Sequence, residues 1–161
     1  MRQGKDRDAV KRFWTAVVIL YIGFIFYNSL TPALESSRQS GGVLAMVLEA
    51  ADSIGMESGW ITEHLIRKTA HFAEYTLLGV LLSAAVRQYS VTVSTERLVK
   101  GWLGTLIPLT DETIQLFVEG RSGQISDVWL DMAGFFTGIL TLWVVGRYFK
   151  TRYSRKRERR M

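Results

Sequence analysis

Hydrophobic residues gather in four segments of the chain, and polar or charged connections separate them. The segments are Phe13 to Leu30, Ala70 to Val86, Leu98 to Phe117 and Val128 to Phe149. Each has about the length that a helix rising 1.5 Å per residue needs to cross a hydrocarbon core ~30 Å thick. The pattern therefore predicts an all-α fold: a polytopic membrane protein whose four transmembrane helices form a bundle.

A shorter amphipathic pattern lies in the long connection between the first two segments. The connection opens with serines and glycines, namely Ser36, Ser37, Ser40, Gly41 and Gly42, and apolar residues then recur at spacings of three and four from Val43 to Ile54. This stretch is too short to span. We expect an extracytoplasmic helix at the membrane interface, as a lid over the bundle or as a tether on lipid, with Trp60 at headgroup depth.

The chain is interpreted as one domain, residues 1–161, with basic tails at 1–12 and 150–161 around a four-span bundle at 13–149. A cleaved signal peptide is the alternative reading of the first segment. That segment is longer than the ~7–15 apolar residues of a signal peptide, and no clear small-x-small cleavage site follows it. We therefore expect a retained span.

The distribution of charge predicts the orientation. Sixteen of the 20 basic residues, but only four of the 15 acidic ones, lie in residues 1–12, 87–100 and 147–161. Four spans place these three segments on one side, and the positive-inside rule makes that side cytoplasmic. Both termini are thus expected in the cytoplasm, with the chain in the plasma membrane. The net charge of +5 then reflects topology, and no nucleic-acid partner is expected.

Polar residues recur near the outer ends of the predicted spans. Asn28 and Ser29 end the first span, and Pro108 is expected to kink the third. Ser126 or Asp127 is expected to cap the fourth helix, whose inward stripe holds Asp127, Asp131, Gly134 and Gly138. The other side chains expected at this depth are Arg67, Lys68, His71, Glu74, Tyr75, Asp111, Glu112, Gln115 and Arg121.

Carboxylates at membrane depth are costly unless they are paired, and here they outnumber the cations. The excess indicates a protonated acid, a bound cation or a polar substrate. The residues expected to be catalytic, by moving protons, are His71, Glu74, Asp111, Glu112 and Asp131. Those expected to bind substrate are Arg67, Lys68, Tyr75, Gln115, Arg121, Asp127, Asn28 and Ser29.

Two other readings of the same residues stay open. One is a structural salt-bridge network that clamps the helices together. The other is a divalent metal held by His71, Glu74 and Asp131, but their spacing is not diagnostic, so no metal ligand and no cofactor are assigned. The chain has no cysteine, which excludes disulfides and thiolate metal sites.

Several ordered motifs resemble the VanZ-like membrane proteins. They are Asn28-Ser29 with Pro32, R-K-x-x-H-F-x-E-Y at 67–75, D-E-x-x-Q at 111–115, Gly120-Arg121, and D-x-x-x-D-x-x-G at 127–134. The resemblance implies a small multi-span envelope protein, from a family named for an association with low-level resistance to the glycopeptide teicoplanin. It implies no particular reaction.

These patterns together predict an outward-facing polar pocket that binds or modifies an amphiphile of the outer leaflet. The expected partners are membrane lipids, a lipid-linked cell-wall intermediate or a lipoglycopeptide, and a homo-oligomer is compatible with the sequence. A non-catalytic envelope scaffold is the alternative. Transport across the membrane is disfavoured, since the inner halves of the spans carry few polar residues.

Overall fold

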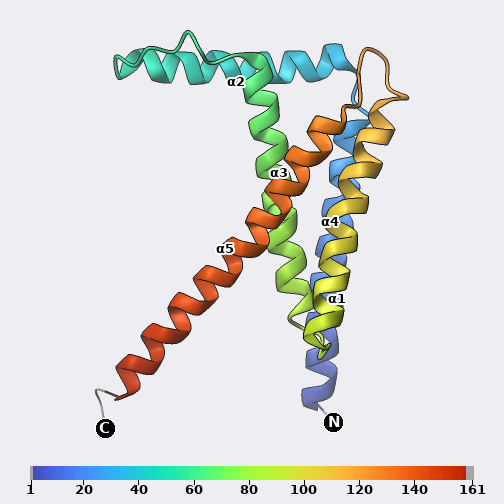
Figure 1. Cartoon of the computed structure of the whole chain (residues 1–161), viewed down its shortest axis with the longest axis vertical. Helices are drawn as coiled ribbons and strands as arrows, with labels where there is room; N and C mark the ends of the chain where they lie inside the picture. The colour runs from blue at the N-terminus through green and yellow to red at the C-terminus, as the bar shows by residue number, and fades with distance from the viewer. Residues whose placement is uncertain (1, 159–161) are drawn as a thin grey trace.

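The computed structural model describes residues 2–158, and their side chains from residue 4 to residue 152. Every regular element in this part is a helix, so the all-α prediction is confirmed there. The helices are α1 (Arg2–Ser29), α2 (Ala33–Ser53), α3 (Glu63–Val86), α4 (Val93–Gln115) and α5 (Ile125–Glu158) (Figure 1).

Four of the helices form a bundle that the fifth covers at one end. The axes of α1, α3 and α4 are nearly aligned, with α3 antiparallel to the other two, while α5 crosses α3 and α2 lies across the end of the bundle (Figure 1). The most extensive packing is between α3 and α5. Both ends of the described chain lie at the end of the molecule opposite α2 (Figure 1).

Among the described residues, three helical stretches are long and apolar enough to cross a membrane. They are Gly4–Ser29, Glu63–Val86 and Ile125–Arg152. Helix α4 does not reach the same mean hydropathy, because charged residues stand near both of its ends, from Glu96 to Lys100 and at Asp111 and Glu112. Three candidate spans support a membrane protein, and the fourth span stays a prediction.

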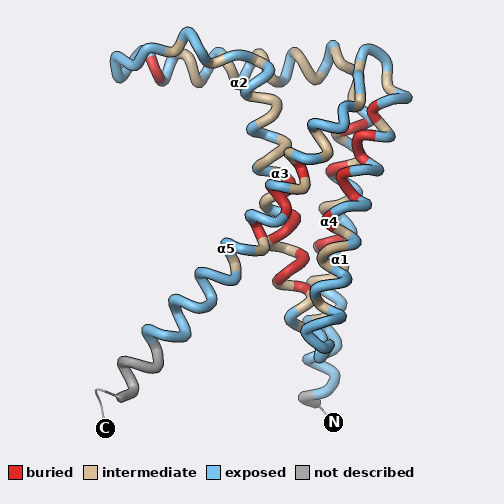
Figure 2. The backbone as a smooth tube through the Cα atoms, viewed as in Figure 1, coloured by how far each residue is buried: buried red, intermediate tan, exposed pale blue. Residues whose placement is uncertain are grey.

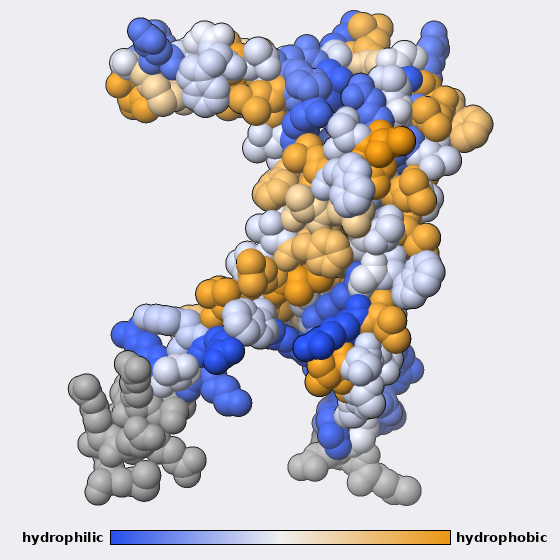
Figure 3. All heavy atoms as spheres, in the orientation of Figure 1, coloured by the Kyte–Doolittle hydropathy of each residue, from blue (hydrophilic) through white to orange (hydrophobic). Residues whose placement is uncertain are grey.

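The buried core is small and lies where α1, α3, α4 and α5 meet (Figure 2). Its largest fully buried apolar side chains are Tyr75, Phe135, Ile25 and Leu78. Of the most apolar window in each candidate span, only 11% of α1 and 22% of α5 is buried inside the molecule. Hydrophobic surface extends over the middle of the molecule, and hydrophilic side chains gather toward its ends (Figure 3). This is the surface expected of a chain surrounded by lipid.

Glycines allow α3 and α5 to pack backbone to backbone. A Cβ atom added at Gly134 would overlap the carbonyl oxygen of Phe72, and one added at Gly138 would overlap that of Thr76. The small-xxx-small stripe predicted on α5 is therefore confirmed as a helix-packing surface. The same stripe turns Asp127 and Asp131 toward α3.

Helix α2 begins at Ala33, so the expectation of a helical pattern only from Val43 is wrong. Its first turn follows Pro32, whose φ of −56° suits a helix start, and the Ser36 amide donates to the Pro32 carbonyl at 3.0 Å. The Ser40 hydroxyl donates to the Ser36 carbonyl at 2.9 Å. Packing of α2 on α3 thus overrides the low helix propensity of the serines and glycines.

The predicted tails continue the helices of the bundle. Helix α1 starts within the first tail, where Lys11 pairs with Asp8 at 3.6 Å, and α5 runs on through the second tail to Glu158. The last residues of that tail, 159–161, lie outside the described residues. Charged side chains at helical spacing support such extensions.

Replacing Gly138 by alanine is expected to lower stability by about 1–3 kcal/mol, because the new methyl group would push α5 away from α3. Thermal unfolding of the purified protein in detergent measures the loss. Gly23→Ala is the matched control, since a Cβ at Gly23 meets nothing within 4 Å. Equal melting temperatures for the two variants would show that the backbone contact does not support the fold.

Candidate functional site

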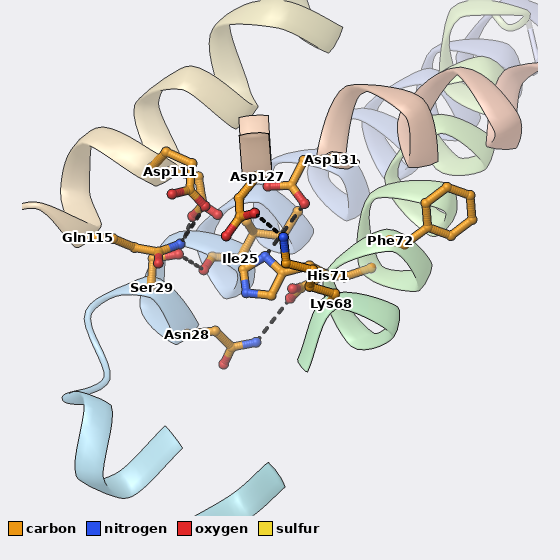
Figure 4. A network of polar contacts seen from close by, with 12 residues as sticks. Ile25, Asn28, Ser29, Lys68, His71, Phe72, Asp111, Gln115, Asp127 and Asp131 are labelled. Carbon is orange, nitrogen blue, oxygen red and sulfur yellow. Dashed lines mark hydrogen bonds and ion pairs between the residues drawn. The ribbon is translucent and has the colours of Figure 1, made fainter. Parts of the chain in front are cut away.

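Polar side chains from four helices converge at the end of the bundle that α2 covers (Figure 4). At their centre are His71 on α3, Asp111 and Glu112 on α4, and Asp131 on α5, hereafter the four-residue cluster. Each offers one nitrogen or oxygen atom, and these atoms all lie within 4.8 Å of one another. The predicted meeting of titratable groups from three different helices is therefore present in the structure.

Helix α1 contributes two side chains from its last turn. The Asn28 amide donates to a Glu74 carboxylate oxygen at 3.0 Å, and the buried Ser29 hydroxyl donates to Asp111. Tyr21, two turns earlier, donates to the backbone carbonyl of Glu74 at 3.1 Å. Asn28 and Ser29 therefore do more than end α1, because they also bond this end of the helix to α3 and α4.

Two contacts one turn apart join α3 to α5. Lys68 Nζ lies 2.8 Å from Asp127 Oδ1, and His71 Nδ1 lies 3.6 Å from Asp131 Oδ1 (Figure 4). The expected capping role of Ser126 or Asp127 is wrong, because α5 already begins at Ile125. Asp127 stands in the first turn of the helix, where its negative charge is favoured by the helix dipole as well as by Lys68.

Both carboxylates of α4 are buried, although they point about 100° apart around the helix. Asp111 faces Ser29 of α1. Glu112 accepts from Gln115 Nε2, one turn further along α4, at 3.0 Å, and its Oε2 accepts from the backbone amide of Gln124, in the connection between α4 and α5, at 2.9 Å. The connection folds back over α4 and completes the burial.

The predicted cations are only partly used to neutralise these acids. Arg67 pairs with Glu63 at 2.5 Å, and Arg121 donates to the Thr31 and Asn28 carbonyls at 2.9 and 3.4 Å. Burial lowers the pKa of the Arg121 guanidinium, and nearby Arg67 lowers it further. Of the three cations expected to act, Lys68 is the one that pairs with a predicted site carboxylate within the described residues.

Much of the carboxylate charge is therefore buried without a cationic partner. Asp111 and Asp131 are both 0% exposed. Within the described part of the chain, Asp111 Oδ2 and both Asp131 oxygens accept no hydrogen bond, and the buried Tyr75 hydroxyl also has no partner. Two like charges about 4 Å apart repel by about 4 kcal/mol at an effective dielectric constant near 20. Such a cluster is stable when its members share a proton or a cation.

Two hollows adjoin the cluster. A polar cavity of about 110 Å³ is lined by Lys68, Glu112, Gln115, Asp127 and His64, among others. A groove of about 610 Å³ runs between α2, α3 and the end of α1, with apolar walls from Phe24, Val43, Val47 and Ile66. Arg67, His71 and Arg121 line both hollows. These three residues therefore stand where a polar space meets an apolar one.

Some contacts of the site were not predicted. Glu63 precedes Arg67 by four residues, so the i,i+4 rule could have paired them. Ser37, which accepts from Arg67 at 3.3 Å, lies on a part of α2 that was not expected to be helical. The Gln124 amide is a backbone group and carries no signal in the sequence. The binding and catalytic roles assigned to the predicted residues remain predictions.

The three long apolar helices and their exposed hydrophobic surface indicate a membrane protein. The chain belongs to the VanZ/LLP1 family, whose family model matches residues 13–146. The match runs from within α1 to within α5 and includes every residue of the four-residue cluster. The resemblance noted in the sequence is thereby confirmed. Neither a curated protein nor a solved structure gave a significant match.

Removing Lys68 is expected to destabilise the protein by about 1–2 kcal/mol, because Asp127 is partly buried and would lose its cationic partner. The variant Lys68→Met keeps most of the apolar stem. A double-mutant cycle with Asp127→Asn, followed by thermal unfolding, isolates the coupling between the two side chains. We expect the double variant to be more stable than the sum of the single losses predicts. Strict additivity would mean that the contact contributes nothing.

Proposed function

We propose that this VanZ/LLP1-family protein crosses the plasma membrane four times, with α4 as the fourth span and both termini in the cytoplasm. The burial pattern of α4 supports this, because Asp111, Glu112 and Gln115 are buried inside the molecule. The exposed face of α4 carries Leu98, Trp102, Leu106 and Leu109, and two of its threonines, Thr105 and Thr113, donate their hydroxyls to backbone carbonyls of the same helix. A helix with this pattern can stand in lipid despite its modest mean hydropathy.

Helix α2 then lies at the outer membrane interface. It runs across the bundle rather than along it (Figure 1). Its exposed apolar side chains include Leu34 at 73%, Met46 at 65% and Ile54 at 75%. An amphipathic helix in this orientation buries such residues among acyl chains and keeps its polar face toward the headgroups.

The function that this arrangement supports best is binding of an anionic amphiphile from the outer leaflet. The observation that carries the proposal is that Arg67, His71 and Arg121 line both the polar cavity and the apolar groove beneath α2. An amphiphile has the same two parts. Its acyl chain would lie in the groove, and its headgroup would meet the two guanidinium groups at the boundary.

Charge favours an anionic headgroup. Arginine forms strong, charge-assisted hydrogen bonds with phosphate and carboxylate oxygens. The partly buried Arg121 donates only to backbone carbonyls in the described structure, so a phosphate would offer it a better acceptor. The ligand class is therefore a phospholipid or a lipid-linked cell-wall intermediate. A lipoglycopeptide fits the association for which the family is named.

In this proposal His71, Glu74, Asp111, Glu112 and Asp131 bind polar groups of the ligand or move protons. Lys68, Tyr75, Gln115, Asp127, Asn28 and Ser29 hold these groups in position. The proposal predicts that any chemistry takes place on the headgroup, because the groove offers no titratable side chain beyond Glu74 and the residues at its polar end.

A second candidate function is a structural one, in which the polar network only clamps the helices of an envelope scaffold. The observation that favours it is that direct contacts already join α1 to α3 and α4, and α3 to α5. In that case substitutions in the network lower the melting temperature in proportion to any lost phenotype. Ligand binding predicts losses of binding at unchanged melting temperature.

The proposed topology predicts that the two ends of α4 lie on opposite sides of the membrane. The chain has no cysteine, so Ser90→Cys and Ser122→Cys each introduce a single exposed thiol, one before and one after α4. A membrane-impermeant maleimide added to intact cells is expected to label position 122 and not position 90. Lysed cells, in which both positions should react, are the control. Labelling of both positions in intact cells would exclude α4 as a span.

Replacing Arg67 or Arg121 by glutamine is expected to weaken binding of phosphatidylglycerol about ten- to a hundredfold, because each variant loses a charge-assisted contact of about 1.5–3 kcal/mol. Native mass spectrometry of the protein in detergent, titrated with the lipid, measures the change. The same variants should lose less affinity for phosphatidylcholine, because the choline cation of that lipid offsets the charge of its phosphate.

The matched control is Arg38→Gln. Arg38 lies on α2 at the same end of the molecule, is 74% exposed, and lines neither hollow. It should bind phosphatidylglycerol normally. Equal weakening in all three variants would reduce the effect to surface charge and would overturn the proposed binding site.

A further inference from the structure

We infer that the four-residue cluster is a binding site for one divalent metal ion, with His71, Asp111, Glu112 and Asp131 as its protein ligands. One ligand atom from each residue lies within 4.8 Å of the other three. Ligands on opposite sides of a cation lie about 4 to 5 Å apart at metal–ligand distances of ~2.0–2.6 Å. The four atoms therefore surround a space of the size that one ion needs.

Burial separates this cluster from ordinary groups of surface acids. Asp111 and Asp131 are 0% exposed and Glu112 is 5% exposed. Both Asp131 oxygens, Asp111 Oδ2 and His71 Nδ1 have no hydrogen-bond partner within the described residues. Buried polar atoms are nearly always satisfied, and these four belong to residues that face one another across three helices (Figure 4). A cation bound among His71, Asp111 and Asp131 would supply the partner that these buried side chains lack.

The surrounding residues hold the ligands as the outer shell of a metal site does. Ser29 donates to Asp111 Oδ1 and leaves Oδ2 without a partner. Gln115 and the backbone amide of Gln124 each donate to one oxygen of Glu112. Such hydrogen bonds fix the orientation of ligating carboxylates. The protein's own cations are engaged elsewhere: Lys68 with Asp127, and Arg67 with Glu63. None of these pairs fills the space between the four ligand atoms.

The kind of ion follows from the ligands. Three carboxylates and one imidazole, in a chain without cysteine, form an oxygen-rich set with a single nitrogen. Carboxylate ligands suit Mn²⁺, and a single imidazole is compatible with that ion. Zn²⁺ is the second candidate, because N/O sites generally bind it more tightly than Mn²⁺. His71 and Glu112 also line the polar cavity, which gives the ion a path to the cluster.

The set differs from the metal reading that the sequence offered. Glu74 is engaged by Asn28 and is not part of the cluster, and Asp111 and Glu112 of α4 take its place. The cluster shares His71 with both hollows of the proposed lipid site, but neither Arg67 nor Arg121 belongs to it, so variants of these arginines leave the metal ligands in place. Its test is therefore independent of the proposed lipid binding.

The full-length protein, purified in detergent and stripped with a chelator, is loaded with Mn²⁺ or Zn²⁺ and desalted. Metal analysis is expected to find about one ion per chain. The variant Asp131→Asn should bind the ion at least tenfold more weakly, and loading should raise the melting temperature of the unchanged protein but not of the variant. Glu119→Gln is the matched control: it removes an exposed carboxylate at the same end of the molecule and should bind normally.

A second variant keeps the test valid if Asp131→Asn does not fold, since Asp131 is fully buried. His71→Asn changes a partly exposed ligand, and electron paramagnetic resonance of bound Mn²⁺ should show coupling to an imidazole nitrogen that this variant lacks. The inference is overturned if the folded, unchanged protein retains neither ion, if Glu119→Gln loses as much metal as Asp131→Asn, or if the nitrogen coupling persists in His71→Asn. Normal metal binding by Arg67→Gln separates this result from failure of the proposed lipid site.

Discussion

The direct packing of α3 on α5 is the contact on which the rest of the structure depends. Gly134 and Gly138 let the α5 backbone lie against the carbonyls of Phe72 and Thr76. Toward the end of the bundle that α2 covers, the same interface continues as polar contacts, first His71 with Asp131 and then Lys68 with Asp127. Because a helix repeats every 3.6 residues, one choice of register fixes all of these contacts together. The close packing at the two glycines of α5 thus sets the positions of the polar side chains further along the same interface.

The site is locally unfavourable, and the surrounding helices make it possible. Three carboxylates within a few ångströms of a histidine would spread apart in water, but here α3, α4 and α5 are held by their apolar contacts at Tyr75, Leu78 and Phe135. A structure that gathers like charges without pairing them tends to do so where it functions. A purely structural clamp needs one acid for each base. In this arrangement the carboxylates outnumber the cations that pair with them. A bound ligand or ion therefore explains the cluster better than a structural role does.

The sequence was most informative where a pattern repeats at helical spacing. The polar start of α3, the stripe on α5 and the acids of α4 were all predicted to meet, and each follows from the 3.6-residue period together with the sidedness of the charges. It was least informative where packing or backbone groups decide. Helix α2 starts among serines and glycines because α3 supports it, and the Gln124 amide reaches Glu112 through the path of a connection. The role of Asp127 was misjudged for the related reason that a helix start cannot be placed to within two residues.

The turn at Glu119, Gly120 and Arg121 joins elements that are distant in the chain. The Glu119 carbonyl accepts from the first amide of α2, and Arg121 donates to the Thr31 carbonyl just after the end of α1. Gly120, between them, has a φ of +72°. Any side chain at Gly120 would be strained there and would also crowd Ala33. Surface connections usually tolerate change more readily than helices do. In this protein a single turn instead joins two helix termini, so the sequence has little freedom to vary at a position that looks from outside like an ordinary loop.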